Sequence, residues 1–182
     1  MKIFYIIPIL IVFVSCKCKK DINLESIKTD SIKNIVSEKM IKSTNPEDGK
    51  CKIEIFKNKS IEIKTSELGE IYYEKVENLD TSVILYSYNR NVPKELQDAN
   101  YREEIVFEIN NANKELSLKD ENLQKTKMLF GRFCYCKGAT GYYIITDGKL
   151  YLTQKNNEIK FDLEFKNNKV PQIILAISET LK

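Results

Sequence analysis

The chain has 182 residues, of which 42% are hydrophobic and 30% charged, a composition that excludes disordered, collagen-like and multi-span membrane proteins. It contains no histidine, which excludes Ser-His-Asp and Cys-His catalytic sites and histidine-rich zinc sites. The net charge is +3, with only three arginines, and the lysines are interleaved with acidic residues instead of forming a basic stripe. We therefore expect a non-enzymatic protein that uses no metal or cofactor and does not bind nucleic acid.

The N-terminus has the pattern of an export signal. Lys2 precedes an apolar run over residues 3–14, which is followed by Ser15 and Cys16. This run is shorter than the roughly 20 residues that a transmembrane helix needs, and it contains Pro8. A charged start, a short apolar core and a small residue before the cleavage point are typical of a secretory signal peptide, which we predict over residues 1–15.

The four residues Phe13-Val14-Ser15-Cys16 resemble the lipobox of bacterial lipoproteins, and the resemblance covers about the first twenty residues. It implies cleavage before Cys16, attachment of a diacylglyceryl group to the Cys16 sulfur and, usually, acylation of the new amine, with palmitate as the expected fatty acid. Two or more acyl chains give lasting membrane attachment. Lys17, which stands where an aspartate would favour the inner membrane, implies the outer bacterial membrane. An uncleaved anchor or a misassigned start is the alternative.

The rest of the chain is predicted to consist of a tether and one domain. Residues 16–29 are polar and rich in lysine, as expected for a lipidated tether. Residues 30–182 are predicted to form one β-rich domain that begins with a helix over 30–43, because Ile32, Ile35, Val36 and Met40 recur at helical spacing. The turn-forming sequence Asn-Pro-Glu-Asp-Gly then ends this helix.

From Cys51 onward, apolar and polar residues alternate, which predicts half-buried strands. The pair Asp147-Gly148 is the strongest hairpin signal. Short connections imply antiparallel pairing, so we predict a mainly β fold, an antiparallel β-sandwich or an open barrel of about nine strands. The C-terminal residues 170–182 suit either a strand or a short helix, and we predict the helix. The predicted strands lie near 51–56, 60–64, 70–76, 82–89, 103–110, 114–118, 126–136, 142–146, 149–154 and 158–166, one of them a bulged continuation of its neighbour.

Four cysteines remain after lipidation of Cys16, in a compartment that permits disulfides. Cys134 and Cys136 would point to the same face of one strand, so that a bond between them would be strained. A bridge from Cys51 to either of them closes a loop of about 84 residues, worth roughly 4 to 5 kcal/mol, and is the pairing we predict. The alternatives are a metal site of three thiolates, free thiols, and a Cys134/Cys136 pair that exchanges with other thiols.

Residues 130–143 are dense in aromatic side chains and glycine. Both faces of the predicted strand 126–136 are mostly apolar, so the strand should be central, with a carboxylate or carbonyl partner for the Arg132 guanidinium. One interpretation is a packed hairpin filled by aromatic rings. The other is a binding patch formed by Arg132, Lys137, Tyr142 and Tyr143.

Beyond the lipobox, no residue pattern indicates a specific reaction or ligand. The leading hypothesis is a lipid-anchored envelope protein, non-enzymatic, that binds another protein, a peptide or a glycan, or has a structural role. A lipocalin-like carrier is the first alternative, and it requires a cavity lined by the alternating Ile, Phe and Leu faces. A thiol redox protein that uses Cys134 and Cys136 is the second.

Overall fold

The computed structural model describes residues 43, 45–93, 95–96 and 98–182, which belong to one compact unit spanning Lys39–Lys182. The predicted signal peptide and tether lie outside the described residues, as does the predicted helix over 30–43 apart from its last residue. Within the described ranges, no helix is long and apolar enough to span a membrane.

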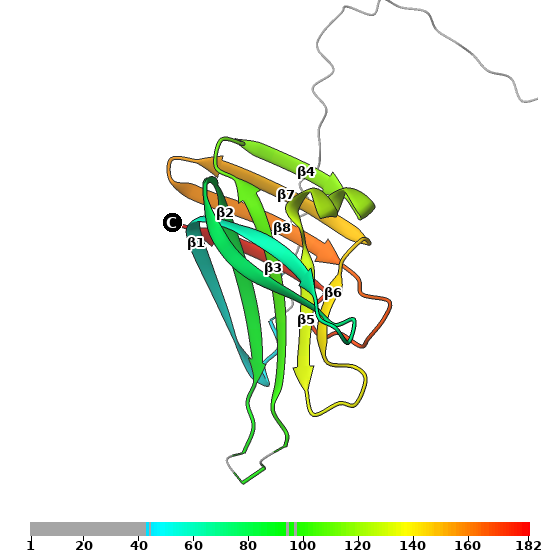
Figure 1. Ribbon diagram of the computed structural model, residues 1–182. Helices are drawn as coiled ribbons and strands as arrows, with labels where there is room; N and C mark the ends of the chain where they lie inside the picture. Colours follow the sequence, from blue (N-terminus) through cyan, green and yellow to red (C-terminus); the bar gives the residue numbers. More distant parts are fainter. Residues whose placement is uncertain (1–42, 44, 94, 97) are drawn as a thin grey trace, which may run out of the picture. The chain divides into compact units, whose positions relative to one another are not determined.

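The described residues form two antiparallel sheets, so the predicted mainly β, antiparallel architecture is confirmed (Figure 1). The first sheet has the order β1-β2-β3-β5-β6 and the second the order β4-β7-β8-β9. The hairpin predicted at Asp147-Gly148 is therefore wrong, because the strands on its two sides, β6 and β7, belong to different sheets. A short 3₁₀ helix, η1, spans Asp120–Thr126 between β4 and β5. The strands are β1 (Gly49–Thr65), β2 (Ile71–Arg90), β3 (Tyr101–Asn110), β4 (Glu115–Lys119), β5 (Leu129–Cys134), β6 (Gly141–Ile144), β7 (Gly148–Lys155), β8 (Glu158–Phe165) and β9 (Ala176–Leu181).

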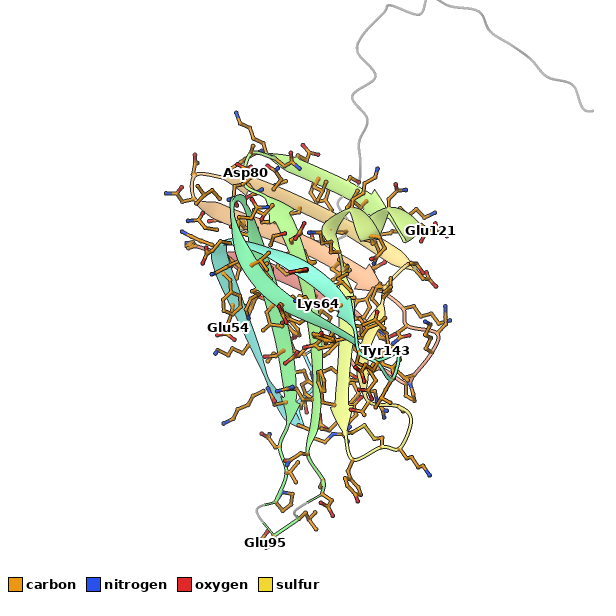
Figure 2. All side chains as sticks on the ribbon, in the orientation of Figure 1. Glu54, Lys64, Asp80, Glu95, Glu121 and Tyr143 are labelled. Carbon is orange, nitrogen blue, oxygen red and sulfur yellow. A yellow bond between two sulfur atoms is a disulfide. The ribbon has the colours of Figure 1, made fainter. Side chains whose placement is uncertain are left out.

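β1 and β2 are longer than the sequence predicts, because each joins two predicted strands. Their pairing shifts at a bulge between Lys57 and Lys59, where Asn58 has a φ of 57°. A bulge bends a strand, and asparagine is one of the few residues that adopt positive φ readily. The far halves, residues 59–65 and 71–77, form a two-stranded arm that crosses in front of the first sheet, with Lys64 on it (Figures 1 and 2).

The arm rejoins the sheet at its tip. Ile71, at the start of β2, pairs with Tyr142 of β6, although β2 and β6 lie far apart in the strand order. This pairing closes β2, β3, β5 and β6 into a ring. The fold therefore has two sheets, as in the predicted sandwich, and four strands of the first sheet close into a ring, whereas the predicted alternative was an open barrel.

Alternation along the strands creates two separate hydrophobic cores. The main core lies between the two sheets, and a smaller one lies between the first sheet and the arm. Burial of this apolar surface on both faces is the main stabilising contribution to the fold. The main core includes Ile84, Tyr86, Ile105, Phe107, Phe130, Leu152, Phe161, Leu163 and Ile177, and the smaller core consists of Ile61, Val83, Val106 and Leu129.

A carboxylate on β3 fixes the arm to the sheet. Glu108 Oε2 accepts hydrogen bonds from the Ser60 hydroxyl and from the Ile61 backbone N–H, each 2.7 Å long. Glu108 Oε1 also forms an ion pair with the ammonium of Lys127 at 2.9 Å, and the same ammonium donates to the Ile61 carbonyl at 2.8 Å. The bulged strand is thus held by charge-assisted bonds just beyond its bend.

A second carboxylate, Glu103, is completely buried on the other face of β3. Its two oxygens accept the backbone N–H groups of Ile173 and Ile174 at 2.7 and 2.8 Å. The hydroxyl of Tyr101 donates a third bond at 2.5 Å. These bonds compensate for burial of the charge and hold the segment that leads into β9 against the first sheet.

The prediction of a C-terminal helix is wrong, because residues 176–181 form strand β9. Pro171 lies in the preceding loop, and Ile177 enters the main core with no exposed surface. β9 pairs with β8 from Ile159↔Leu181 to Glu164↔Ala176, so it supplies hydrogen-bond partners along a strand that would otherwise be an open edge. The predicted strand 126–136 is likewise shorter, starting at Leu129 after the left-handed residue Lys127.

Replacing Glu108 by alanine should destabilise the fold by about 2 kcal/mol, because it removes the partner of the Ile61 N–H on the inner side of the arm. Urea denaturation measures the change. Glu62→Ala, on the exposed side of the same arm, is the control and should cost less than about 0.5 kcal/mol. Equal effects of the two substitutions would contradict the proposed role of Glu108.

Candidate functional site at the end of strand β5

Strand β5 is central and covered on both faces, as predicted. It lies between β3 and β6 in the sheet. Phe130 packs in the main core and Leu129 in the smaller core, and neither has exposed surface. The sequence predicted that the helix over 30–43 or another sheet covers the second face; among the described residues, the cover is the arm of β1 and β2.

Arg132 has the carbonyl partner that its burial predicts. Only 9% of its surface is exposed, and its Nη1 donates to the Ala139 carbonyl at 2.8 Å. Its Nε donates to the Tyr101 hydroxyl at 3.3 Å, and that hydroxyl in turn donates to Glu103. The buried positive and negative charges are thus linked through one phenol, and the bond to Ala139 fixes the loop between β5 and β6.

The disulfide in this loop differs from the predicted one. Cys134 is bonded to Cys136, with their Cα atoms 5.1 Å apart, while Cys51 is free and exposed. The predicted bridge from Cys51 is therefore wrong. The sequence prediction assumed that Cys134 and Cys136 lie on the same face of one strand. Instead, β5 ends at Cys134, and Cys136 lies in the following loop.

The four residues of the predicted binding patch do not share one surface. Arg132 is buried, and Lys137 is exposed in the β5–β6 loop. Tyr142 and Tyr143 are neighbours on β6 and so point to opposite faces, Tyr142 toward the smaller core and Tyr143 toward the main core. These residues support the hairpin more directly than they form a contact surface.

Tyr142 is the centre of an aromatic cluster on the arm side of the sheet. Its ring lies edge-on to those of Tyr73 and Phe133, with centroids 5.2 and 5.1 Å away. Its hydroxyl donates to Glu104 Oε2 at 2.5 Å, and Glu104 also forms an ion pair with Arg102 at 3.2 Å. Burial, followed by the bond to Glu104, raises the pKa of the Tyr142 hydroxyl.

A surface concavity of about 560 Å³ adjoins the disulfide. The guanidinium of Arg90 lies over the Tyr101 ring at 4.7 Å, and that of Arg102 lies over the Phe133 ring at 4.4 Å. Each guanidinium also pairs through Nε with a carboxylate, so the arginine charges are neutralised locally. The exposed ring of Tyr135 completes the wall.

Sequence reasoning missed Arg90, Tyr101 and Arg102 as members of this site. The strand register brings them together, because Asn89 pairs with Arg102 and Tyr101 pairs with Cys134. The adjacent charges of Arg102, Glu103 and Glu104 were visible in the sequence. Which face of the sheet each side chain occupies, however, depends on where β3 begins. Among the described residues, no group of three or more His, Cys, Asp or Glu side chains is placed to hold a metal ion.

Comparison of the chain with protein-family models, with curated proteins and with solved structures finds no match. The site is therefore interpreted from its own chemistry. The half-buried disulfide can exchange with other thiols. The neutralised arginines and the exposed tyrosine and lysine side chains beside it can contact a partner.

The buried phenols predict a loss of stability in alkaline solution. Burial, followed by the hydrogen bond to Glu103, raises the pKa of Tyr101 from 10.0 to about 12, and burial also raises the pKa values of Tyr73, Tyr86, Tyr88 and Tyr142. Because the folded protein holds these protons more tightly than the unfolded chain, their contribution is fully present below pH 10 and is lost as the pH rises through 12.

Absorbance at about 295 nm reports phenolate formation during an alkaline titration. We expect the buried tyrosines to ionise only above pH 10, together with loss of β-sheet circular dichroism. Ionisation of these buried tyrosines near pH 10 with the sheet signal intact would contradict the burial described above.

Proposed function

We propose that this chain is a lipoprotein of the bacterial envelope, anchored through Cys16, whose β-rich domain binds a partner molecule outside the cytoplasm. The observation that carries the proposal is the sequence Phe13-Val14-Ser15-Cys16 at the end of a short apolar run. Acylation of Cys16 would hold the domain at a membrane, and Lys17 favours the outer one.

The disulfide supports this compartment. Cys134 and Cys136 are bonded to each other, and such bonds persist in oxidising environments such as the bacterial periplasm and the cell surface. In the cytoplasm, reducing systems would keep the same pair as thiols. The export signal and the bonded cysteines thus point independently to the same side of the membrane.

The filled interior supports a binding module over a carrier. Phe107, Phe130 and Phe161, from both sheets, have no exposed surface, and the ring centroids of Phe107 and Phe161 are 5.4 Å apart. The alternating faces that would line a carrier's cavity are instead packed against each other. The concavities of 530 to 560 Å³ found in the described part of the chain are lined mainly by loop and strand-end residues.

Replacing Cys16 by alanine tests the anchor. The variant should lose the fatty acid and move from the membrane fraction to the soluble fraction, because no acyl chain remains to hold it. Metabolic labelling with radioactive palmitate and cell fractionation measure both changes. Cys51→Ala is the matched control and should stay lipidated and membrane-bound.

Two results would contradict the anchor. The first is a Cys16→Ala protein that still fractionates with the membrane and carries label. The second is a native product that retains its initiating methionine and carries no fatty acid. Either result would also remove the main argument for an extracytoplasmic location.

Thiol exchange is a second candidate function, favoured by the Cys134–Cys136 bond. A thiolate of an external dithiol would attack one sulfur to form a mixed disulfide, and its second thiol would then displace the protein sulfur. The products are two protein thiols and the partner's disulfide, a transfer of two electrons. Lys137 lies next to Cys136 in the chain, and a nearby cation lowers the pKa of a thiol.

Peptide mapping after alkylation distinguishes an exchanging bond from a structural one. Before reduction, only Cys51 of the described cysteines should be alkylated. In a glutathione buffer poised like an oxidising compartment, an exchanging pair should be partly reduced, whereas a structural pair stays bonded. Complete resistance to the buffer, or alkylation of Cys134 and Cys136 before reduction, would eliminate this candidate.

A further inference from the structure

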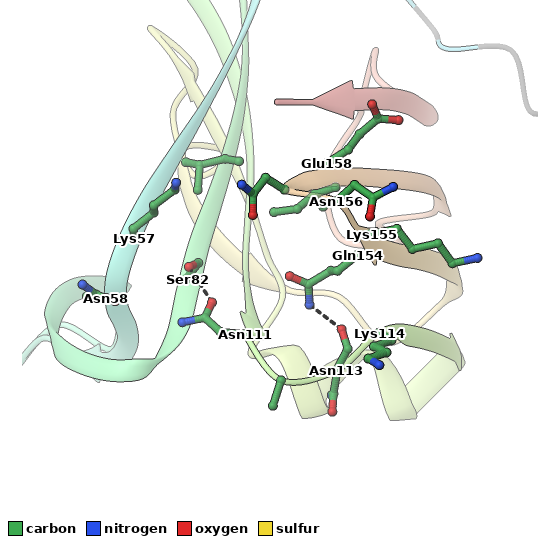
Figure 3. Close-up of a pocket in the computed structure, with 14 residues that line it drawn as sticks. Lys57, Asn58, Ser82, Asn111, Asn113, Lys114, Gln154, Lys155, Asn156 and Glu158 are labelled. Carbon is green, nitrogen blue, oxygen red and sulfur yellow. Dashed lines mark hydrogen bonds between the residues drawn. The ribbon is translucent and has the colours of Figure 1, made fainter.

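A polar cleft of about 540 Å³ lies at the other end of β3, away from the disulfide (Figure 3). The bend of β1 at Asn58 and two turns, β3–β4 and β7–β8, meet there. Every residue that lines the cleft lies in the described part of the chain. Its volume is within the range of about 300 to 1,000 Å³ that small-ligand sites occupy.

The floor of the cleft is fixed by hydrogen bonds. The Ser82 hydroxyl donates to Asn111 Oδ1 at 2.7 Å, and Asn111 Nδ2 donates to the Leu79 carbonyl at 3.0 Å. Gln154 Nε2 donates to the carbonyls of Asn110 and Asn113 at 2.8 and 2.6 Å. These bonds join the first sheet to the β3–β4 turn and the turn to the second sheet; Figure 3 shows those from Ser82 to Asn111 and from Gln154 to Asn113.

The walls are positively charged. Lys57, Lys114 and Lys155 come from three different segments, and within the described residues their ammonium groups form no ion pair or hydrogen bond. Lys127, by contrast, forms an ion pair with Glu108 of β3 at 2.9 Å. Glu158 is the one carboxylate among the residues lining the cleft, so the lining has a net positive charge.

Side-chain amides surround these charges. Asn58, Asn113, Asn156 and Asn157 line the cleft, and their amide groups have no hydrogen-bond partner among the described residues. Three of them, Asn58, Asn156 and Asn157, have φ values between 51° and 63°, so the turns that position them are ones that asparagine favours. Each amide can both donate to and accept from a hydroxyl group.

We propose that this cleft binds an anionic glycan, a saccharide bearing carboxylate groups. The inference rests on the proposed function as an envelope binding module and names its ligand class. Ammonium groups on separate walls attract carboxylates, and the amides between them match the hydroxyls of sugar rings. No aromatic residue lines the cleft, so a nucleobase or a neutral sugar has no ring to stack on.

Titration calorimetry tests the proposal with the full lipidated chain in detergent micelles. The probe is a hexamer of galacturonic acid, maltohexaose is the neutral control of equal length, and inorganic phosphate reports a simple anion site. We expect binding of the hexagalacturonate alone, weakening as salt is added. No binding of the hexagalacturonate, or equal binding of phosphate or maltohexaose, would overturn the proposal.

Variants then locate the binding. The triple variant Lys57→Ala, Lys114→Ala and Lys155→Ala should weaken affinity about tenfold or more, since three attractions of modest size are removed. The matched control, Lys50→Ala with Lys125→Ala and Lys160→Ala, removes the same charge elsewhere and should change affinity less than about twofold. Equal losses would mean non-specific attraction and would overturn the proposal.

A charge-neutral variant separates recognition from attraction. Asn156→Gly with Asn157→Gly keeps residues that tolerate positive φ and so retains the β7–β8 turn, but it removes two amides. Affinity should fall about threefold or more while circular dichroism stays unchanged, and unaltered affinity would overturn the role of the amides. None of these substitutions alters Cys16, so all variants should stay attached to the membrane. Failure of the glycan proposal is therefore distinguishable from failure of the lipid anchor.

Discussion

Three carboxylates on strand β3 bond to segments that do not pair with β3 as neighbouring strands. Glu108 binds the bulged arm at Ser60 and Ile61, while Glu104 binds Tyr142 of β6, the residue whose pairing with Ile71 closes the ring. Glu103, on the opposite face, binds the segment before β9. Each carboxylate is buried or mostly covered, so leaving one unpaired would be costly, and the bonds therefore specify where these segments dock.

Hydrogen bonds also fix the loops at the two ends of β3, where we propose that partners or ligands bind. At one end, the link from Glu103 through Tyr101 to Arg132 fixes the loop that carries the disulfide. At the other end, β3 leads into the turn that forms the floor of the polar cleft. A rigid central strand with functional groups at its two ends is a common way to preorganise binding surfaces on a β fold.

Local patterns predicted most strands, because alternation needs only neighbouring residues. The segment Ile159, Phe161, Leu163 and Phe165 is such a case, and all four enter or contact the main core. The C-terminal strand and the Cys134–Cys136 bond were mispredicted because each depends on where another element ends. Contacts such as Glu103 to Ile173, 70 residues apart, leave no local signal, so neither the docking of the arm nor the polar cleft was visible in the sequence.

Native-state hydrogen exchange on a Glu103→Ala variant tests the central role of these carboxylates most directly. The amides of Ile173 and Ile174 lie outside the strands and bond only to Glu103 among the described residues, so they should become fast-exchanging while the amide of Ile61 keeps its protection. Unchanged slow exchange at Ile173 and Ile174 in a folded variant would show that the segment is held by packing and not by the buried carboxylate.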